Sequence, residues 1–147
     1  MILPDLNLLV YAHHREASVH AAARAWWEER LSATQPVCLS WIVVLGFIRL
    51  STNRAVFREP LSAADACSQV RSWLAQPQVM LLEPGSRHAN ILFGLLEEIG
   101  TAGNLTTDAH LAALAIEHQC ELQSTDADFA RFSGLRWRNP LRVGNGR

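Results

Sequence analysis

Short apolar segments alternate with helical segments along the whole chain, and this alternation constrains the fold more than any other feature of the sequence. The segments typical of buried strands are residues 2–5, 37–40, 79–82 and 120–125, with residues 136–138 as a last edge strand. Helical patterns cover residues 8–14, 19–32, 41–51, 62–74, 86–99 and 108–115. Strands that alternate with helices form parallel sheets, so the sequence predicts an α/β fold on a parallel sheet.

The length of the chain fits one domain with a substantial core. With 147 residues, 49% of them hydrophobic, it can bury enough apolar surface to fold alone. We expect a single domain over residues 1–142 and a flexible, glycine-rich tail over residues 143–147. No run of 18 apolar residues and no signal peptide is found, so we expect a cytoplasmic protein with no membrane partner.

Charge and cysteine content exclude some classes of protein. The net charge is −1, so RNA binding would need a local basic patch; all 13 basic residues are arginine, which suits phosphate contacts. Cys38, Cys67 and Cys120 are widely spaced and form no C-x-x-C pair. We expect them to be small buried residues in a reducing compartment, not disulfides or a zinc site.

An acidic residue opens the last long helical segment. Thr106 and Thr107 are candidate N-caps, and Asp108 then falls in the first turn, where the helix dipole favours negative charge. Asp108 shares a face with Leu111 and Ala112, so its carboxylate should point inward and need a partner. Dipole stabilisation alone would also explain Asp108, but further acids elsewhere in the chain favour a shared cation.

Those acids follow two predicted strands. Asp5 ends the first strand, before a helix that Asn7 would cap, and Asp126 and Asp128 follow the strand at residues 120–125. Because ligands in α/β sheets gather at the carboxyl ends of strands, Asp5, Asp108 and Asp126 can meet in one crevice. Clustered carboxylates repel one another, and Mg²⁺ or Mn²⁺ relieves that repulsion. Such a site suits phosphoryl transfer with metal-activated water.

Several segments together resemble one known family. They are Asp5-Leu6-Asn7, residues 39–53 with the run LGFIRLSTN, residues 106–115 (TTDAHLAALA), residues 124–129 (STDADF) and residues 135–141 (LRWRNPL). In this order they cover nearly the whole chain. By them the chain resembles PIN-domain proteins, specifically the VapC-type ribonuclease toxins of bacterial toxin–antitoxin pairs.

The resemblance implies both a fold and an activity. The fold would be a three-layer sandwich with a central parallel sheet of about five strands. The activity would be that of an endoribonuclease that cuts structured RNA such as tRNA or ribosomal RNA, acts as a homodimer and is neutralised by a cognate antitoxin. Asp5, Asp108 and Asp126 would hold Mg²⁺ or Mn²⁺, and Asp128 would be a fourth acid. The positioning side chains would be Asn7 and Thr125.

One position departs from the family pattern. Most members carry a glutamate in the helix after the second strand, where this chain has Gly46. Residues 31–58 contain no acid that could replace it, so a second metal ion is in question. A catalytically weak module that binds protein or RNA is therefore an alternative hypothesis, and a phosphatase or DNA nuclease with the same acids is another.

Basic and aromatic residues give candidate binding surfaces. Arg49 is the only charge on the apolar helix at residues 41–51, a helix fit to be covered on more than one side. It would hold an RNA phosphate near the metal or, alternatively, snorkel or pair with a carboxylate. Arg54 and Arg58 flank Phe57 in a loop suited to single-stranded RNA, although an ordinary solvated loop has the same pattern. The adjacent Trp26 and Trp27 are not expected to face one core together, so one of them is a candidate for a partner surface.

Overall fold

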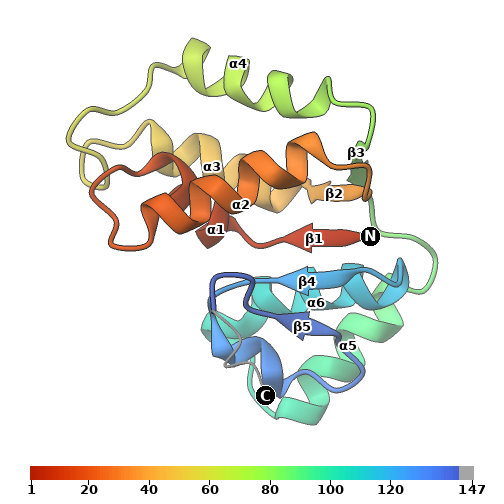
Figure 1. The fold of residues 1–147 in the computed structure, drawn as a ribbon. Helices are drawn as coiled ribbons and strands as arrows, with labels where there is room; N and C mark the ends of the chain where they lie inside the picture. The colour runs from red at the N-terminus through yellow and green to blue at the C-terminus, as the bar shows by residue number, and fades with distance from the viewer. Residues whose placement is uncertain (143–147) are drawn as a thin grey trace.

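Five parallel strands form the central sheet of the computed structural model, which describes residues 1–142 (Figure 1). The strands are β1 (Ile2–Pro4), β2 (Val37–Ser40), β3 (Val79–Leu82), β4 (Glu121–Gln123) and β5 (Trp137–Arg138). Their order is β3-β2-β1-β4-β5, and every neighbouring pair is parallel. The predicted parallel sheet is confirmed, whereas the tail predicted at residues 143–147 lies outside the described residues.

Helices cover both faces of this sheet. They are α1 (Leu6–His13), α2 (His20–Ser32), α3 (Trp41–Ser51), α4 (Ala63–Leu74), α5 (His88–Ile99) and α6 (Thr106–Glu117), with 3₁₀ turns η1 (Gly103–Leu105) and η2 (Ala127–Arg131). The crossovers from β1 to β2 to β3 place α1–α4 on one face, and the return to β4 places α5 and α6 on the other (Figure 1). The three-layer architecture of the PIN fold is therefore confirmed.

The sheet reverses its direction of growth at β1. The chain moves outward from β1 to β2 and β3, and then returns to add β4 on the other side of β1. The carboxyl ends of β1 and β4 therefore lie side by side at a topological switch point, where α/β sheets leave a crevice. The first helical turn of α6 follows η1 and completes this end of the molecule.

Helix caps explain several of the element boundaries. Ser40 Oγ accepts from the Val43 amide at 3.3 Å and starts α3, and Ser62 Oγ accepts from the Asp65 amide at 3.0 Å and starts α4. Gly100 ends α5 in the left-handed conformation, with φ of 76°. These caps agree with the helical segments predicted at residues 62–74 and 86–99.

Two predicted caps are wrong. Asp5, not Asn7, is the N-cap of α1, because the chain turns into the helix directly after β1. Thr106 and Thr107 lie inside α6 rather than before it. The helix follows η1 without a break, and the Thr106 hydroxyl turns back to donate to the Gly103 carbonyl at 2.8 Å.

The prediction that Trp26 and Trp27 cannot both be buried is also wrong. They are only 8% and 3% exposed. Trp26 Nε1 donates to Gln123 Oε1 of β4 at 3.0 Å. Trp27 packs edge-on against Trp73 of α4, with ring centroids 5.5 Å apart. Covering on two adjacent sides lets consecutive residues face the interior, so this pair offers no free partner surface.

Helix α3 is covered on only part of its surface. Val43, Val44 and Phe47 are buried, but Trp41 and Leu45 are 50% and 60% exposed. The apolar helix that was expected to be covered on more than one side therefore leaves one apolar strip open within the chain. Along residues 1–142, none of the helices has the length and apolar character needed to cross a membrane.

Candidate metal and catalytic site

Three of the predicted acids line one small cavity at the carboxyl ends of the strands. Asp5 follows β1, Asp126 follows β4 and Asp108 stands in the first turn of α6. The cavity has a volume of about 150 Å³. Its other lining residues are Leu6, Asn7, Ile42, Val43, Thr107 and Leu111. The predicted meeting of these three acids in one crevice is confirmed, and their roles in metal binding and catalysis remain predictions.

Asp5 is held in a fixed orientation. Its side chain caps α1, because Oδ1 accepts from the Leu6 amide at 2.7 Å. Its other oxygen, Oδ2, accepts from the Ser124 hydroxyl at 2.7 Å. Asp5 is only 8% exposed, so these two hydrogen bonds replace much of the water that the carboxylate loses.

Ser124 links two of the acids, and sequence reasoning missed it. The residue is fully buried directly after β4. Its oxygen accepts from the Asp126 amide at 3.0 Å while its hydroxyl donates to Asp5. The signal was present in the run Ser124-Thr125-Asp126, but a side chain two residues before an acid can equally point away from the site.

Asp126 and Asp128 have different surroundings. Asp126 caps η2, because its Oδ1 accepts from the Asp128 amide at 2.9 Å, and its side chain lines the cavity. The Asp128 side chain is exposed and is not among the cavity-lining residues. Asp128 is still close enough for its charge to act on Asp108. Its role as a fourth acid remains a prediction.

The electrostatics of the cavity follow from crowding of negative charge. Burial, and then the charges of Asp5, Asp126 and Asp128, raise the pKa of Asp108 from 3.8 to about 6. Burial also raises the pKa of Asp5, and Asp126 adds to this, while the hydrogen bonds from Ser124 and Leu6 oppose it. The carboxylates thus carry their charges at a cost, which a bound cation would reduce.

The donor set fits a hard divalent cation. Mg²⁺ and Mn²⁺ prefer carboxylate oxygens, and the site offers three carboxylates around one cavity with mutual repulsion to be relieved. Across residues 1–142, no three His, Cys, Asp or Glu side chains lie close enough together to hold a metal ion as they stand. The acids therefore share a cavity rather than a preformed metal shell.

The other predicted site residues are more scattered. Asn7 lines the cavity and Thr125 is half-buried next to Ser124, but within the described chain neither forms a hydrogen bond to an acid. Arg49, Arg54 and Arg58 are exposed, and none of them is among the described residues that line the acid cavity. Arg58 Nη1 instead lies 3.8 Å from Glu16 Oε1. Contact of these residues with RNA remains a prediction.

The absence of a side chain at Gly46 has a structural basis. A Cβ built at this position would lie 2.5 Å from Leu6 Cδ2. Leu6 lines the acid cavity, so a leucine fills the space next to the position where most of the family has a glutamate.

Comparison with known proteins agrees with this geometry. The model of the PIN domain family matches residues 2–135. Ribonuclease VapC33 of Mycobacterium tuberculosis is 46% identical over 142 residues, which cover 97% of this chain and 99% of that protein. Ribonuclease VapC37 of the same species is 42% identical over 140 residues, which cover 95% of this chain and 97% of that protein.

Solved structures share the fold at lower identity. VapBC2 from Rickettsia felis, bound to a DNA fragment from its promoter, matches with a TM-score of 0.68 and 19% identity, covering 95% of this chain and 98% of that chain. VapC20 of Mycobacterium tuberculosis, described as a sarcin-ricin loop cleaving toxin, matches with a TM-score of 0.66 and 19% identity. The match covers 92% of this chain and 99% of that chain. Together, the family match, the near full-length relatives and the common fold show that the chain belongs to the PIN domain family and, within it, to the VapC branch.

Proposed function

We propose that this protein is an endoribonuclease toxin that depends on Mg²⁺ or Mn²⁺ and cleaves cellular RNA such as tRNA or ribosomal RNA. The observation that carries the proposal is the convergence of Asp5, Asp108 and Asp126 on one cavity at the switch point of the sheet. Relatives named as ribonucleases, 42–46% identical over nearly the full chain, support the choice of RNA as substrate.

Each acid would have a distinct part in the reaction. Asp5, Asp108 and Asp126 would hold the cation, and Asp128 would add negative charge at the edge of the site. A divalent cation bound there would supply Lewis acidity to the scissile phosphate and lower the pKa of water. Ser124 would keep Asp5 and the start of η2 in register, so that the carboxylates need little rearrangement when the substrate arrives.

Substrate contacts would come from outside the cavity. Arg49, Arg54 and Arg58 lie on α3 and in the loop that follows it, where their exposed guanidinium groups would meet phosphates along a single strand. Phe57 is 8% exposed and packs against His14, so it serves more as an anchor for this loop than as a stacking platform.

The partners would be those of a toxin–antitoxin pair. Similar folds occur in VapBC complexes from Rickettsia felis and nontypeable Haemophilus influenzae, which supports a cognate antitoxin here. The strip formed by Trp41 and Leu45 on α3 is the surface we assign to an antitoxin helix, since Trp26 and Trp27 are buried. We further propose a homodimer that acts in the cytoplasm.

Gly46 favours one cation over two. With Leu6 filling the space beside Gly46, α3 brings no carboxylate to the cavity. The same feature is the reason to test a non-cleaving module that only binds protein or RNA.

The test is induced expression of the wild-type chain beside Asp108→Asn, with RNA ends mapped from the same cells. We expect only the wild type to arrest growth, with new RNA ends that name the target. Purified protein is then given RNA, DNA and a small phosphoester with Mg²⁺ or Mn²⁺. Equal growth arrest by both chains, or no metal-dependent RNA cleavage in either assay, would refute the proposal. Binding of RNA without cleavage would favour the non-cleaving binding module. Cleavage of DNA or of the phosphoester in place of RNA would favour another hydrolase.

A further inference from the structure

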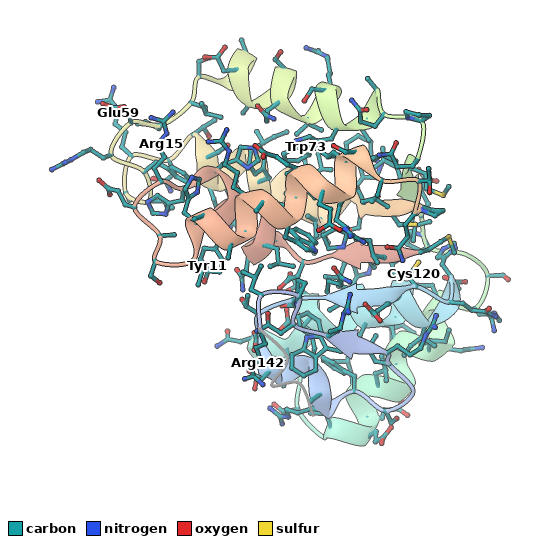
Figure 2. All side chains as sticks on the ribbon, viewed as in Figure 1. Tyr11, Arg15, Glu59, Trp73, Cys120 and Arg142 are labelled. Atoms are coloured by element: carbon teal, nitrogen blue, oxygen red, sulfur yellow. The ribbon has the colours of Figure 1, made fainter. Side chains whose placement is uncertain are left out.

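Three sulfur atoms meet at the amino-terminal end of the sheet, opposite the acids. Cys38 Sγ lies 3.9 Å from Met1 Sδ and 3.9 Å from Cys120 Sγ. The three residues belong to neighbouring segments: Met1 precedes β1, Cys38 lies in β2 and Cys120 precedes β4. Figure 2 shows Cys120 at the end of the sheet where the amino terminus lies, with sulfur atoms drawn close to it.

The register of the sheet explains this meeting. Ile2 is paired with Val37 of β2 and Glu121 of β4, so these three residues point to one face. Side chains alternate along strands. Met1 and Cys120 stand one residue before this level and Cys38 one residue after it, so all three point to the opposite face. Ala115 and Ile116 of α6 line a cavity together with Cys120, which identifies this as the face covered by α6.

The same register disfavours a disulfide. Cys38 and Cys120 lie on the two flanks of β1 and at different levels along the strands, so their Cα atoms are at least two strand spacings apart, roughly 9–10 Å. A disulfide needs Cα atoms within about 7 Å unless the backbone moves. Both cysteines are free thiols in the structure.

A bridging metal ion fits where a disulfide does not. Thiolate–metal bonds are about 2.3 Å long, so two sulfurs on one ion lie about 3.8–4.0 Å apart at tetrahedral to trigonal angles. The distances from Cys38 Sγ to Met1 Sδ and to Cys120 Sγ, each 3.9 Å, fall in this range. Two thiols and a thioether form a soft donor set, which selects Cu(I). Zinc would need more nitrogen or thiolate ligands, and residues 1–142 contain no group of three His, Cys, Asp or Glu side chains that could supply them.

The surroundings allow an ion to enter and its charge to be balanced. Cys120 lines a cavity of about 330 Å³ together with Gln119, Gly134 and Arg136. The Arg136 guanidinium group donates to the Gln119 carbonyl, which holds a positive charge near the Cys120 thiol. Met1 is 44% exposed, so the cluster is accessible from the surface although Cys38 and Cys120 are buried.

We infer that Met1, Cys38 and Cys120 form a binding site for one soft monovalent cation, Cu(I), at the amino-terminal end of the sheet. The ion would link the segments of β1, β2 and β4 and so stabilise the folded state over the unfolded chain. This site is separate from the acid cavity and does not depend on the proposed nuclease activity.

The test is a titration of the full reduced chain with Cu(I) under anaerobic conditions, with a chromophoric Cu(I) chelator as competitor. We expect the wild type to retain one equivalent and its Tm to rise. Cys38→Ser and Cys120→Ser should weaken binding on the order of a hundredfold, because each removes one of three ligands. The matched control is Cys67→Ser, a half-buried thiol on α4, which should bind as the wild type does.

X-ray absorption of the copper-loaded wild type makes the test independent of how well the variants fold. A shell of three sulfur atoms is expected. A shell of nitrogen or oxygen ligands, failure of the wild type to retain Cu(I) against the chelator, or equal loss in Cys67→Ser would overturn the inference. A Cys38–Cys120 disulfide formed readily in air, detected as a loss of two hydrogens by mass spectrometry, would overturn it as well.

Discussion

The two ends of the parallel sheet collect opposite kinds of side chain. At the carboxyl end, Asp5, Asp108 and Asp126 surround a cavity, whereas at the amino end Met1, Cys38 and Cys120 bring three sulfur atoms together. Segments next to β1 and β4 contribute to both groups. Position along the strand decides the difference, because residues that follow the strands reach the crevice of a switch point, while the sulfur-bearing residues stand near the amino ends of the strands.

The energetic consequences differ as much as the chemistry. Crowded carboxylates repel one another, and the pKa of Asp108 rises to about 6 as a result of burial and that repulsion. Buried thiols are neutral in their protonated form and pack as small apolar groups. At the carboxyl end, a bound cation would therefore relieve the electrostatic repulsion between the carboxylates. At the amino end, the sulfur ligands are stable without a bound ion.

Removing acids from the carboxyl end should have the largest effect. Asp5→Asn or Asp126→Asn should lower metal-dependent cleavage of RNA on the order of a thousandfold, because the lost charge stabilisation amounts to several kcal/mol. Asp128→Asn should cost less, since its side chain does not line the cavity. Cleavage rates of purified chains at saturating Mg²⁺ measure this. Asp65→Asn, an exposed acid on α4, is the control; an equal loss there would contradict the assignment.

Removing the hydroxyl of Ser124 should have a smaller but clear effect. Ser124→Ala would leave Asp5 Oδ2 and the Asp126 amide without a partner, and we expect about a 10- to 100-fold loss of activity and of Mn²⁺ affinity. Calorimetric titration with Mn²⁺ separates this from a general loss of stability. Ser124→Thr keeps the hydroxyl and should restore part of the affinity. A Mn²⁺ affinity unchanged in Ser124→Ala would show that the bridge does not position the acids.

The sheet and its acids were predictable because they depend on local pattern and on one topological rule. Alternating strands and helices give the parallel sheet, and strand ends give the meeting of Asp5 with Asp126. What could not be predicted depends on contacts between distant segments. Burial of both Trp26 and Trp27 requires a helix covered by β4 on one side and α4 on another.

Details of side-chain direction were also beyond the sequence. Ser124, rather than Thr125, reaches Asp5, because the chain turns directly after β4 and only a placed backbone tells which neighbour points inward. Cys38 and Cys120 are 82 residues apart and were expected only to be buried. Their contact follows from the strand register around β1, which no short motif encodes.

The stored charge should make stability depend on pH. Because the pKa of Asp108 is raised, from 3.8 to about 6, its stabilising contribution is fully present below pH 3.8 and is lost as the pH rises through about 6. Asp108→Asn should therefore have the same Tm as the wild type near pH 4, but a Tm a few degrees higher than the wild type at pH 7.5 in EDTA. This difference in Tm corresponds to about 1–2 kcal/mol of unfolding free energy after allowance for solvent screening.

Scanning calorimetry across this pH range tests the charge argument. Mg²⁺ at pH 7.5 should narrow the difference in Tm between the wild type and Asp108→Asn, because the ion stabilises the wild type more. Glu97→Gln, an exposed acid on α5, serves as the matched control and should show no such crossover. A variant that is less stable than the wild type in EDTA at pH 7.5 would mean that the carboxylates do not repel one another enough to matter.

The smallest expected effect comes from paired glycine substitutions in two helices. Gly46→Ala in α3 would place Cβ 2.5 Å from Leu6 Cδ2, which lines the acid cavity, and should destabilise the fold by about 1 kcal/mol after the gain in helix propensity. Gly94→Ala in α5 meets nothing within 4 Å and should stabilise by about 0.5–1 kcal/mol. Denaturant unfolding measures the change in stability of both variants.

Adding Leu6→Ala to Gly46→Ala should remove most of the loss of stability at position 46, since the two residues are in contact and their effects should not add. If both glycine substitutions instead stabilise equally, Leu6 yields freely, and the close packing of α1 against α3 does not explain why this chain lacks a side chain at Gly46.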